Sequence, residues 1–283
     1  MRTIKHIHKA AYEPIADLVT YRALPTHSVQ YIDPFLFLNH HGPQIYAPDN
    51  NGLPFGPHPH RGFETVTFVI EGDIEHRDSG GNSGTIFPGG IQWMTAGRGL
   101  IHSEISSDGF KASGGKLEIL QLWLNLPAKY KMVDPGYKDL QKEDIPVHVS
   151  EDGKVTAAVM AGEWKGTQGA YQPIVDISLF LLEIQATGIA ETIIPAEQNV
   201  FFYVVKGSVI VNGTTVPQFH LVEFENDDQE LVIEATIDST ILLGHALPFN
   251  EPVVAQGPFV MNTQEEIREA YNDYNAGKFG VFR

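Results

Sequence analysis

Two pairs of potential metal ligands, each pair separated by one residue, stand out in the sequence. His58 and His60 precede a run rich in β-branched and aromatic residues, in GPHPHRGFETVTFVIEG. His102 and Glu104 show the same alternation in GLIHSEIS. Because alternate side chains of a β-strand point to one face, each pair can project from its strand in a single direction. Strand pairing can then bring the two pairs together although they are far apart in the sequence.

Three neutral imidazoles and one carboxylate form a ligand set for a divalent transition metal. The chain has no cysteine, which excludes disulfides and thiolate sites. Nitrogen and oxygen ligands suit Fe(II), Mn(II), Ni(II), Co(II), Cu(II) or Zn(II). Four protein ligands leave positions open on an ion that favours five or six, so the pattern predicts a reactive site rather than a structural one.

Glu64 is a further acidic candidate beside these pairs. It lies four residues beyond His60, which by parity places it on the face of that histidine. Each metal-bound imidazole needs an acceptor for its other ring nitrogen. Glu64 is therefore a candidate either for such an acceptor or for a further ligand.

The elements expected to carry these residues are short β-strands. Runs of Val, Ile, Phe, Tyr and Thr recur between Gly, Asn, Asp and Pro, as in KLEILQLWLNLP and NVFFYVVKGSVIVNG. This spacing is typical of antiparallel barrels and sandwiches. The exception is a predicted C-terminal helix, in which Thr263 and Glu266 form a capping box and Gly277 ends the helix.

A weak internal repeat indicates two copies of one β-unit. TFVIEG at 67–72 and FYVVKG at 202–207 share a pattern at an offset of 135 residues, as expected for a duplicated unit. The proline-rich and charged stretch PAKYKMVDPGYKDLQKEDIP is the expected connector. The repeat therefore predicts two domains, at 1–133 and 134–283.

The net charge of −16 at pH 7 argues against nucleic acid as a ligand, because such binding depends on Lys and Arg that neutralise phosphates. An anionic membrane surface is disfavoured for the same reason. No apolar run approaches the ~18 residues needed to span a bilayer, and the N-terminus lacks the apolar core of a signal peptide. With the absence of cysteine, these features predict a cytoplasmic protein.

Several blocks of sequence carry a family resemblance over nearly the whole chain. They are HPHRGFETVTFVIEG, HRDSGGNSG, PGGIQWMTAGRGLIHSE, EILQLWLNLP and NEPVVAQGPFVMNTQEEI. With these blocks the chain resembles the pirin family of the cupin superfamily. The resemblance implies an all-β bicupin, with two face-to-face jelly-roll barrels, a short C-terminal helix, and metal only in the N-terminal barrel. The repeat agrees, since an offset of 135 carries His58 and His60 onto Ile193 and Pro195, which cannot bind an ion.

The resemblance also implies a ligand set of one iron, or a similar divalent ion, bound by His58, His60, His102 and Glu104. Pirins take the carboxylate from the HSE segment, so Glu64 is expected to lie behind the ligands rather than to bind the ion. His76, in EHRDSGG, is expected to shape a turn or the pocket rim and to support the site without binding the ion.

Two functions follow from the resemblance. Some bacterial pirins resemble quercetin 2,3-dioxygenases, which implies a flavonol-like substrate, dioxygen, and ring cleavage with loss of carbon monoxide. Glu104 is then the expected proton acceptor, and Phe63, Trp93 and Met94 are candidate walls for a flat ring system. The alternative is a metal-dependent regulatory module that binds a protein partner and has only incidental dioxygenase activity. Its partner is a transcription regulator, as in eukaryotic pirins, or a metabolic enzyme, as in some bacterial ones, and it contacts no nucleic acid directly. The four ligands are the same in both.

Overall fold

The computed structural model describes residues 1–283, and two β-barrels form from the chain. We define the histidine barrel as residues Tyr12–Tyr21, Phe35–Lys142 and Phe249–Arg283, and the apolar barrel as Met1–Ala11, Arg22–Pro34 and Glu143–Pro248. The boundary predicted near residue 134 assumes that the chain passes from one domain to the other only once. Instead, the first strand belongs to the apolar barrel, and the C-terminal helix belongs to the histidine barrel.

Each barrel combines a seven-stranded sheet with a four-stranded sheet. In the histidine barrel, the larger sheet has the order β12 (Gly136–Leu140), β9 (Ile91–Thr95), β6 (Phe63–Glu71), β11 (Gly115–Asn125), β4 (Phe35–Tyr46), β3 (Thr20–Leu24), β2 (Ala11–Tyr12). The smaller sheet has the order β5 (Phe55–His60), β10 (Leu100–Ile105), β7 (Ile74–Asp78), β8 (Ser83–Ile86).

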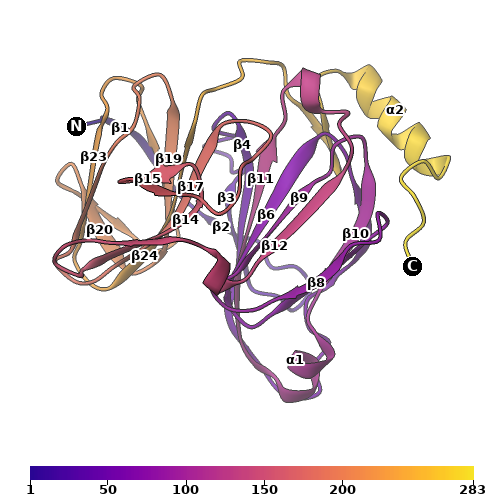
Figure 1. Ribbon diagram of the computed structural model, residues 1–283, viewed down its shortest axis with the longest axis horizontal. Helices are drawn as coiled ribbons and strands as arrows, with labels where there is room; N and C mark the ends of the chain where they lie inside the picture. Colours follow the sequence, from indigo (N-terminus) through magenta and orange to yellow (C-terminus); the bar gives the residue numbers. More distant parts are fainter. The chain divides into compact units, whose positions relative to one another are not determined.

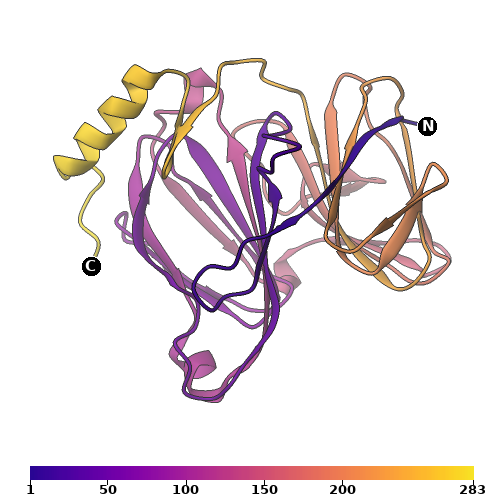
Figure 2. The ribbon, with the colours of Figure 1, turned by 180° about the vertical axis from the view of Figure 1, so that it is seen from behind.

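The sheets of the apolar barrel follow the same plan. The larger has the order β1 (Ile4–Lys9), β22 (His220–Phe224), β19 (Asn199–Lys206), β24 (Ser239–Ala246), β17 (Ile177–Ile184), β14 (Val155–Ala161), β13 (Val147–Val149). The smaller has the order β18 (Ile189–Ile193), β23 (Glu230–Ala235), β20 (Ser208–Val211), β21 (Thr214–Pro217). Seen from behind, indigo β1 runs beside the orange strands (Figure 2), in agreement with its antiparallel pairing to β22.

The remaining elements are short. They are the hairpins β15 (Glu163–Trp164) with β16 (Thr167–Gln168) and β25 (Val254–Gln256) with β26 (Phe259–Met261), the helices α1 (Asp108–Ser113) and α2 (Gln264–Asn275), and the 3₁₀ turns η1 (Ala128–Tyr130) and η2 (Lys142–Asp144). Figure 1 shows α2 in yellow near the end of the chain. Thr263 caps the N-terminus of α2 and forms the predicted capping box with Glu266. No helix has both the length and the apolar character to cross a bilayer.

The shared strand order establishes that the barrels are two copies of one unit. Strands β6 and β19 carry the TFVIEG and FYVVKG segments, and each occupies the third place in its seven-stranded sheet. A glycine with a left-handed backbone directly follows each strand, Gly72 with φ of 85° and Gly207 with φ of 89°. Glycine adopts this conformation without a steric penalty, which explains its recurrence at the turn.

The two interiors differ in composition. A single large apolar cluster fills the apolar barrel, and its aromatic members are Trp164, Phe180, Phe202 and Phe224. The histidine barrel instead has several smaller apolar clusters. Between them it buries polar side chains, namely His60, Thr65, Thr67, His76, Gln92, His102 and Glu104. Buried polar groups cost free energy unless they are hydrogen-bonded, so this interior requires specific partners.

Candidate metal centre

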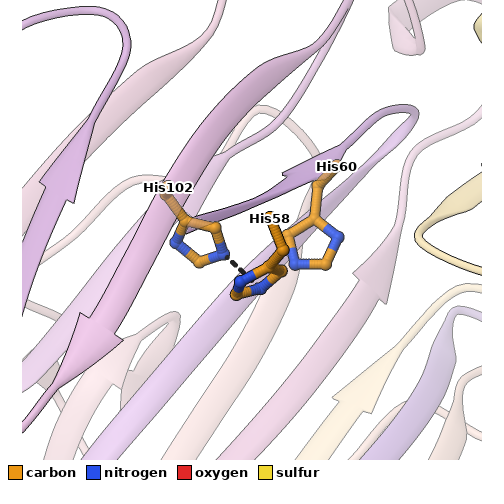
Figure 3. A group of neighbouring side chains, drawn as sticks. All are labelled: His58, His60 and His102. Atoms are coloured by element: carbon orange, nitrogen blue, oxygen red, sulfur yellow. Dashed lines mark hydrogen bonds between the residues drawn. The ribbon is translucent and has the colours of Figure 1, made fainter. Parts of the chain in front are cut away.

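Three histidines converge on neighbouring strands of the histidine barrel. His58 and His60 lie on β5, and His102 lies directly opposite His58 on β10. The Nε2 atoms of His58 and His102 are 3.0 Å apart, and ligand nitrogens from all three residues lie within 4.8 Å of one another. Figure 3 shows the three rings turned toward one point. The alternation within each strand, together with the antiparallel register, accounts for this convergence.

Burial keeps two of these imidazoles neutral. His60 is 4% exposed and His102 is fully buried. Desolvation, with a contribution from His58, lowers the pKa of His60 to about 3. Desolvation also holds the pKa of His102 well below its ordinary value, helped by the neighbouring imidazoles. Neutral imidazole is the form that binds metal ions.

Backbone carbonyls orient two of the three rings. His58 Nδ1 lies 2.8 Å from the carbonyl oxygen of Gly56, and His60 Nδ1 lies 3.2 Å from that of Pro258. In each case the ring donates through Nδ1–H, which leaves Nε2 unprotonated. Two oriented imidazoles and the neutral ring of His102 therefore fit a divalent transition metal ion.

Glu104 is a buried carboxylate on β10, two residues beyond His102. Its Oε1 accepts hydrogen bonds from Thr67 Oγ1, at 2.8 Å, and from Gln92 Nε2. Its Oε2 accepts one from Gln121 Nε2, at 2.6 Å. The carboxylate is not among the ligand atoms within 4.8 Å of one another. The structure thus shows the Glu104 carboxyl group held by three donors on the strand of His102, with a lone pair left on Oε2.

The register of β6 with β9 places Phe63 and Met94 on the interior face of the sheet. Thr67 pairs with Gln92, and both side chains donate to Glu104, so their face looks into the barrel. Met94 is two residues from Gln92, and Phe63 is four residues from Thr67, so both share this face. The structure therefore leaves these two residues as candidates for the pocket wall.

Trp93 and Glu64 point to the opposite face, which corrects two expectations. Trp93 alternates with the inward residues of β9, and Glu64 pairs with Thr95. Thr95 Oγ1 donates to the Glu64 carboxyl at 2.6 Å, and burial raises the pKa of that carboxyl to about 7. Glu64 does not lie behind the candidate ligands, because the turn at 61–62 interrupts the parity counted from His60. Trp93 does not line the pocket, because only alternate residues of β9 face the interior.

An aromatic wall beside His60 was missed in the sequence. Trp123 on β11 lies 5.3 Å from His60 and 4.4 Å from Phe63 between ring centroids. It also stacks on Phe37 of β4, at 4.5 Å. The signal was the alternation in KLEILQLWLNLP, which places Trp123 on the same face as Gln121. The wall gives the site an apolar side suited to a flat ligand.

His76 lies inside the barrel rather than at a turn or rim. It is fully buried on β7, opposite Glu104 on β10. Its ring stacks on Tyr137 with centroids 4.1 Å apart and lies 5.4 Å from the ring of His102. His76 Nε2 is 3.2 Å from Asp78 Oδ2. The expected place at the rim is therefore wrong: His76 packs beside His102 inside the barrel.

Comparison with known proteins gives relatives along the full chain. The family model described as Pirin matches residues 17–124, and the model described as Pirin C-terminal cupin domain matches residues 180–280. A pirin-like protein of Caulobacter vibrioides is 39% identical over 263 residues, covering 91% of this chain and 91% of the relative. A pirin-like protein of Solanum lycopersicum is 37% identical over 266 residues, covering 93% and 87%. A crystal structure described as quercetin 2,3-dioxygenase from Acinetobacter baumannii matches with a TM-score of 0.92 at 33% identity, covering 100% of both chains.

Proposed function

The chain belongs to the pirin family, and we propose that it is a metal-dependent dioxygenase that cleaves flavonols such as quercetin. The observation that carries the proposal is the convergence of three histidine ligand nitrogens beside an aromatic wall. Two of these imidazoles are held neutral by burial. The name of the similar Acinetobacter baumannii protein supports the same substrate class.

The proposed ligands of the ion are His58, His60, His102 and Glu104. The proposed ion is Fe(II), and Mn, Ni, Co, Cu and Zn are the alternatives, since the same ligand types accept all of them. When bound, the ion supplies Lewis-acid polarisation of an oxygen donor. A carboxylate beside three neutral imidazoles also offsets part of the charge of a divalent ion.

Glu104 is the proposed acceptor of the proton that leaves the flavonol hydroxyl. Its Oε1 already accepts two hydrogen bonds, whereas Oε2 accepts only one, from Gln121. Oε2 therefore has the free lone pair, which takes the proton when the carboxylate loosens from the ion. The three donors hold the carboxylate in one orientation, so it need not reorganise when the substrate arrives.

The aromatic wall is proposed to position the flavonol rings. The ring of Trp123 contacts those of both Phe63 and Phe37, and the three rings exclude water from one side of the site. The buried Nε1 of Trp123 has no hydrogen-bond partner within the protein. An unpaired buried donor is costly, so this N–H is a suitable donor to an oxygen of the bound flavonol.

The function is tested by loading the protein with Fe(II) and following the flavonol absorbance band of quercetin in air. We expect the band to bleach with wild-type protein and to persist with His60→Ala. The matched control is His27→Ala, which removes an exposed histidine of the apolar barrel and should bleach quercetin like wild type. A loaded wild-type protein that leaves the band unchanged contradicts the dioxygenase and favours a metal-dependent module that binds a protein partner.

A further inference from the structure

The segment that follows β25 supplies the acceptor for His60. The Nδ1 of His60 lies 3.2 Å from the carbonyl oxygen of Pro258, which stands between β25 and β26. This contact selects the Nδ1–H tautomer and leaves Nε2 for an ion. A carbonyl from a distant part of the chain can act in this way only if its segment is held in place.

Backbone contacts attach this segment to the corner between β5 and β6. Arg61 forms a parallel bridge with Phe259, and the N–H of Val260 donates to the carbonyl of Arg61 at 3.0 Å. At Gly62, whose φ is +89°, an added Cβ would lie only 2.0 Å from the carbonyl oxygen of Val260. The segment can therefore approach the corner this closely only because residue 62 is a glycine.

Lys131 joins the corner and the segment from inside the barrel. It is 1% exposed, and its Nζ donates to the carbonyls of Gly62 and Val260, at 2.8 and 3.0 Å, and to Asn125 Oδ1, at 2.7 Å. All three ammonium protons thus have acceptors, which a buried cation requires. The Lys131 side chain thus links Gly62 of the corner to Val260 of the segment.

Arg61 makes a second link, to α2. Its Nη2 donates to Asp273 Oδ2 at 2.9 Å, and its Nε donates to the carbonyl of Arg98 at 2.6 Å. The guanidinium also lies over the ring of Phe279, 4.7 Å from its centroid. Because Arg61 directly follows His60, this ion pair fixes the backbone that carries the histidine.

We propose that Lys131 and Arg61 are positioning residues of the metal centre: they hold the Pro258 carbonyl against His60 and thereby fix the tautomer and direction of its imidazole. The inference rests on the proposed ligand role of His60. Both residues act through His60 and are not proposed to contact the substrate or the ion. Loss of a group that orients a metal ligand weakens metal affinity by about 10–100-fold.

Titration of the full-length protein with Co(II) tests the proposal without any turnover. We expect Lys131→Met to bind Co(II) about 10–100-fold more weakly, with a changed visible absorption band. Lys131→Arg, which keeps the charge and the donors, should recover part of the affinity. The control Lys129→Met removes a nearby exposed lysine that lies over the ring of Tyr130 and should bind like wild type. Wild-type affinity and spectrum in Lys131→Met would overturn the proposal.

A second variant and a metal-free measurement decide the case if Lys131→Met does not fold. Asp273→Asn breaks the ion pair to Arg61 on α2 and should weaken Co(II) binding in the same direction. In the metal-free protein, ¹⁵N spectra of the histidine side chains report which nitrogen of His60 carries the proton. Wild type should show Nδ1–H alone, and Asp273→Asn should show a mixture; a single unchanged tautomer contradicts the inference. Wild type that binds no Co(II) contradicts the ligand set instead, so the two failures are distinguishable.

Discussion

The two barrels share a topology and differ in what fills them. Strands β10 and β23 occupy the same place in their sheets. Strand β10 pairs with β7, and β23 pairs with β20. When the registers of these two strand pairs are aligned, Leu231 and Ile233 correspond to His102 and Glu104. Both Leu231 and Ile233 belong to the large apolar cluster. Duplication thus preserved the fold while only one copy has a potential metal site.

The contrast extends to the donors that hold Glu104. Matching β6 to β19 by the offset of 135 residues places Phe202 at the position of Thr67. The register partners of Thr67 are Gln92 and Gln121. The register partners of Phe202 are Val222 and Leu243, and all three belong to the apolar cluster. A whole hydrogen-bonding set is therefore exchanged for apolar packing.

The difference shows the cost of a polar interior. In the histidine barrel, His76 Nδ1, Gln92 Oε1 and Tyr137 Oη are buried without a hydrogen-bond partner in the protein. Each such atom costs about 1–3 kcal/mol. Functional sites commonly sacrifice stability in this way. The apolar barrel has no such set around Ile233, which is consistent with a structural role.

The largest expected effect comes from giving the histidine barrel a residue of the apolar barrel. His102→Leu should lower quercetin cleavage by at least ~10³-fold, because the Lewis-acid contribution of a bound ion is worth several kcal/mol. The unfolding free energy should not fall, since Leu needs no polar partner. Steady-state oxygen uptake and urea denaturation measure the two quantities. Residual activity near that of the control His27→Leu would count against the site.

The reverse exchange should be nearly as severe for stability. Ile233→Glu places a carboxylate in the apolar cluster without donors, and we expect the unfolding free energy to fall by about 4 kcal/mol or more. Val232→Glu, the same substitution on the half-exposed neighbour of β23, should cost less than about 1 kcal/mol. Urea titrations compare the two. Equal urea midpoints for the two variants would show that the interior of the apolar barrel tolerates a carboxylate.

A smaller effect concerns the pH dependence of stability in the histidine barrel. The pKa of Glu64 rises from 4.5 to about 7 on folding because of burial, so the folded state binds a proton more tightly than the unfolded chain does. Its contribution to the unfolding free energy is therefore full below pH 4.5 and is lost as pH rises through about 7. Glu64→Gln should flatten that decline by about 1–3 kcal/mol, measured by denaturation between pH 4.5 and 8.

The matched control for this prediction is Glu71→Gln, at the other end of β6. Glu71 is only partly buried, so this variant should keep the wild-type pH slope. If Glu64→Gln also keeps that slope, the buried carboxyl does not titrate in this range.

The smallest effect is expected at the aromatic wall. Trp123→Leu should raise KM for quercetin by about 2–10-fold, since an aromatic contact contributes ~0.5–1.5 kcal/mol, while Co(II) affinity stays unchanged. Trp164→Leu makes the same change in the apolar barrel, where Trp164 packs on Phe180. It should lower stability and leave KM unchanged. An unchanged KM in Trp123→Leu would remove the wall from the substrate site.

Parity within a strand predicted much of the site from the sequence. The alternation within one strand predicts a shared face for His58 with His60 and for His102 with Glu104, because each pair lies in a single uninterrupted strand. Parity failed across the turn at 61–62, where the count from His60 was carried into another strand. The face expected for Glu64 is wrong for that reason. Trp93 and Met94 are neighbours in β9, so only one of them can face the interior.

The sequence does not reveal which segments far apart in the chain pair with one another. Nothing local in β1 shows that it pairs with β22, and nothing in α2 shows that Asp273 binds Arg61. The offset between the two copies also changes along the chain: between β5 and β18 it is one residue shorter than 135. The strand registers match His58 and His60 to Thr192 and Ile194, rather than to Ile193 and Pro195. The conclusion that this copy lacks ligands is the same.

The most direct test of the central claim is anomalous diffraction from crystals of the protein soaked in Ni(II). We predict one strong peak per chain, within bonding distance of the Nε2 atoms of His58, His60 and His102 and of the carboxylate of Glu104. A histidine barrel without a peak, or a peak bound by residues of the apolar barrel, would contradict it.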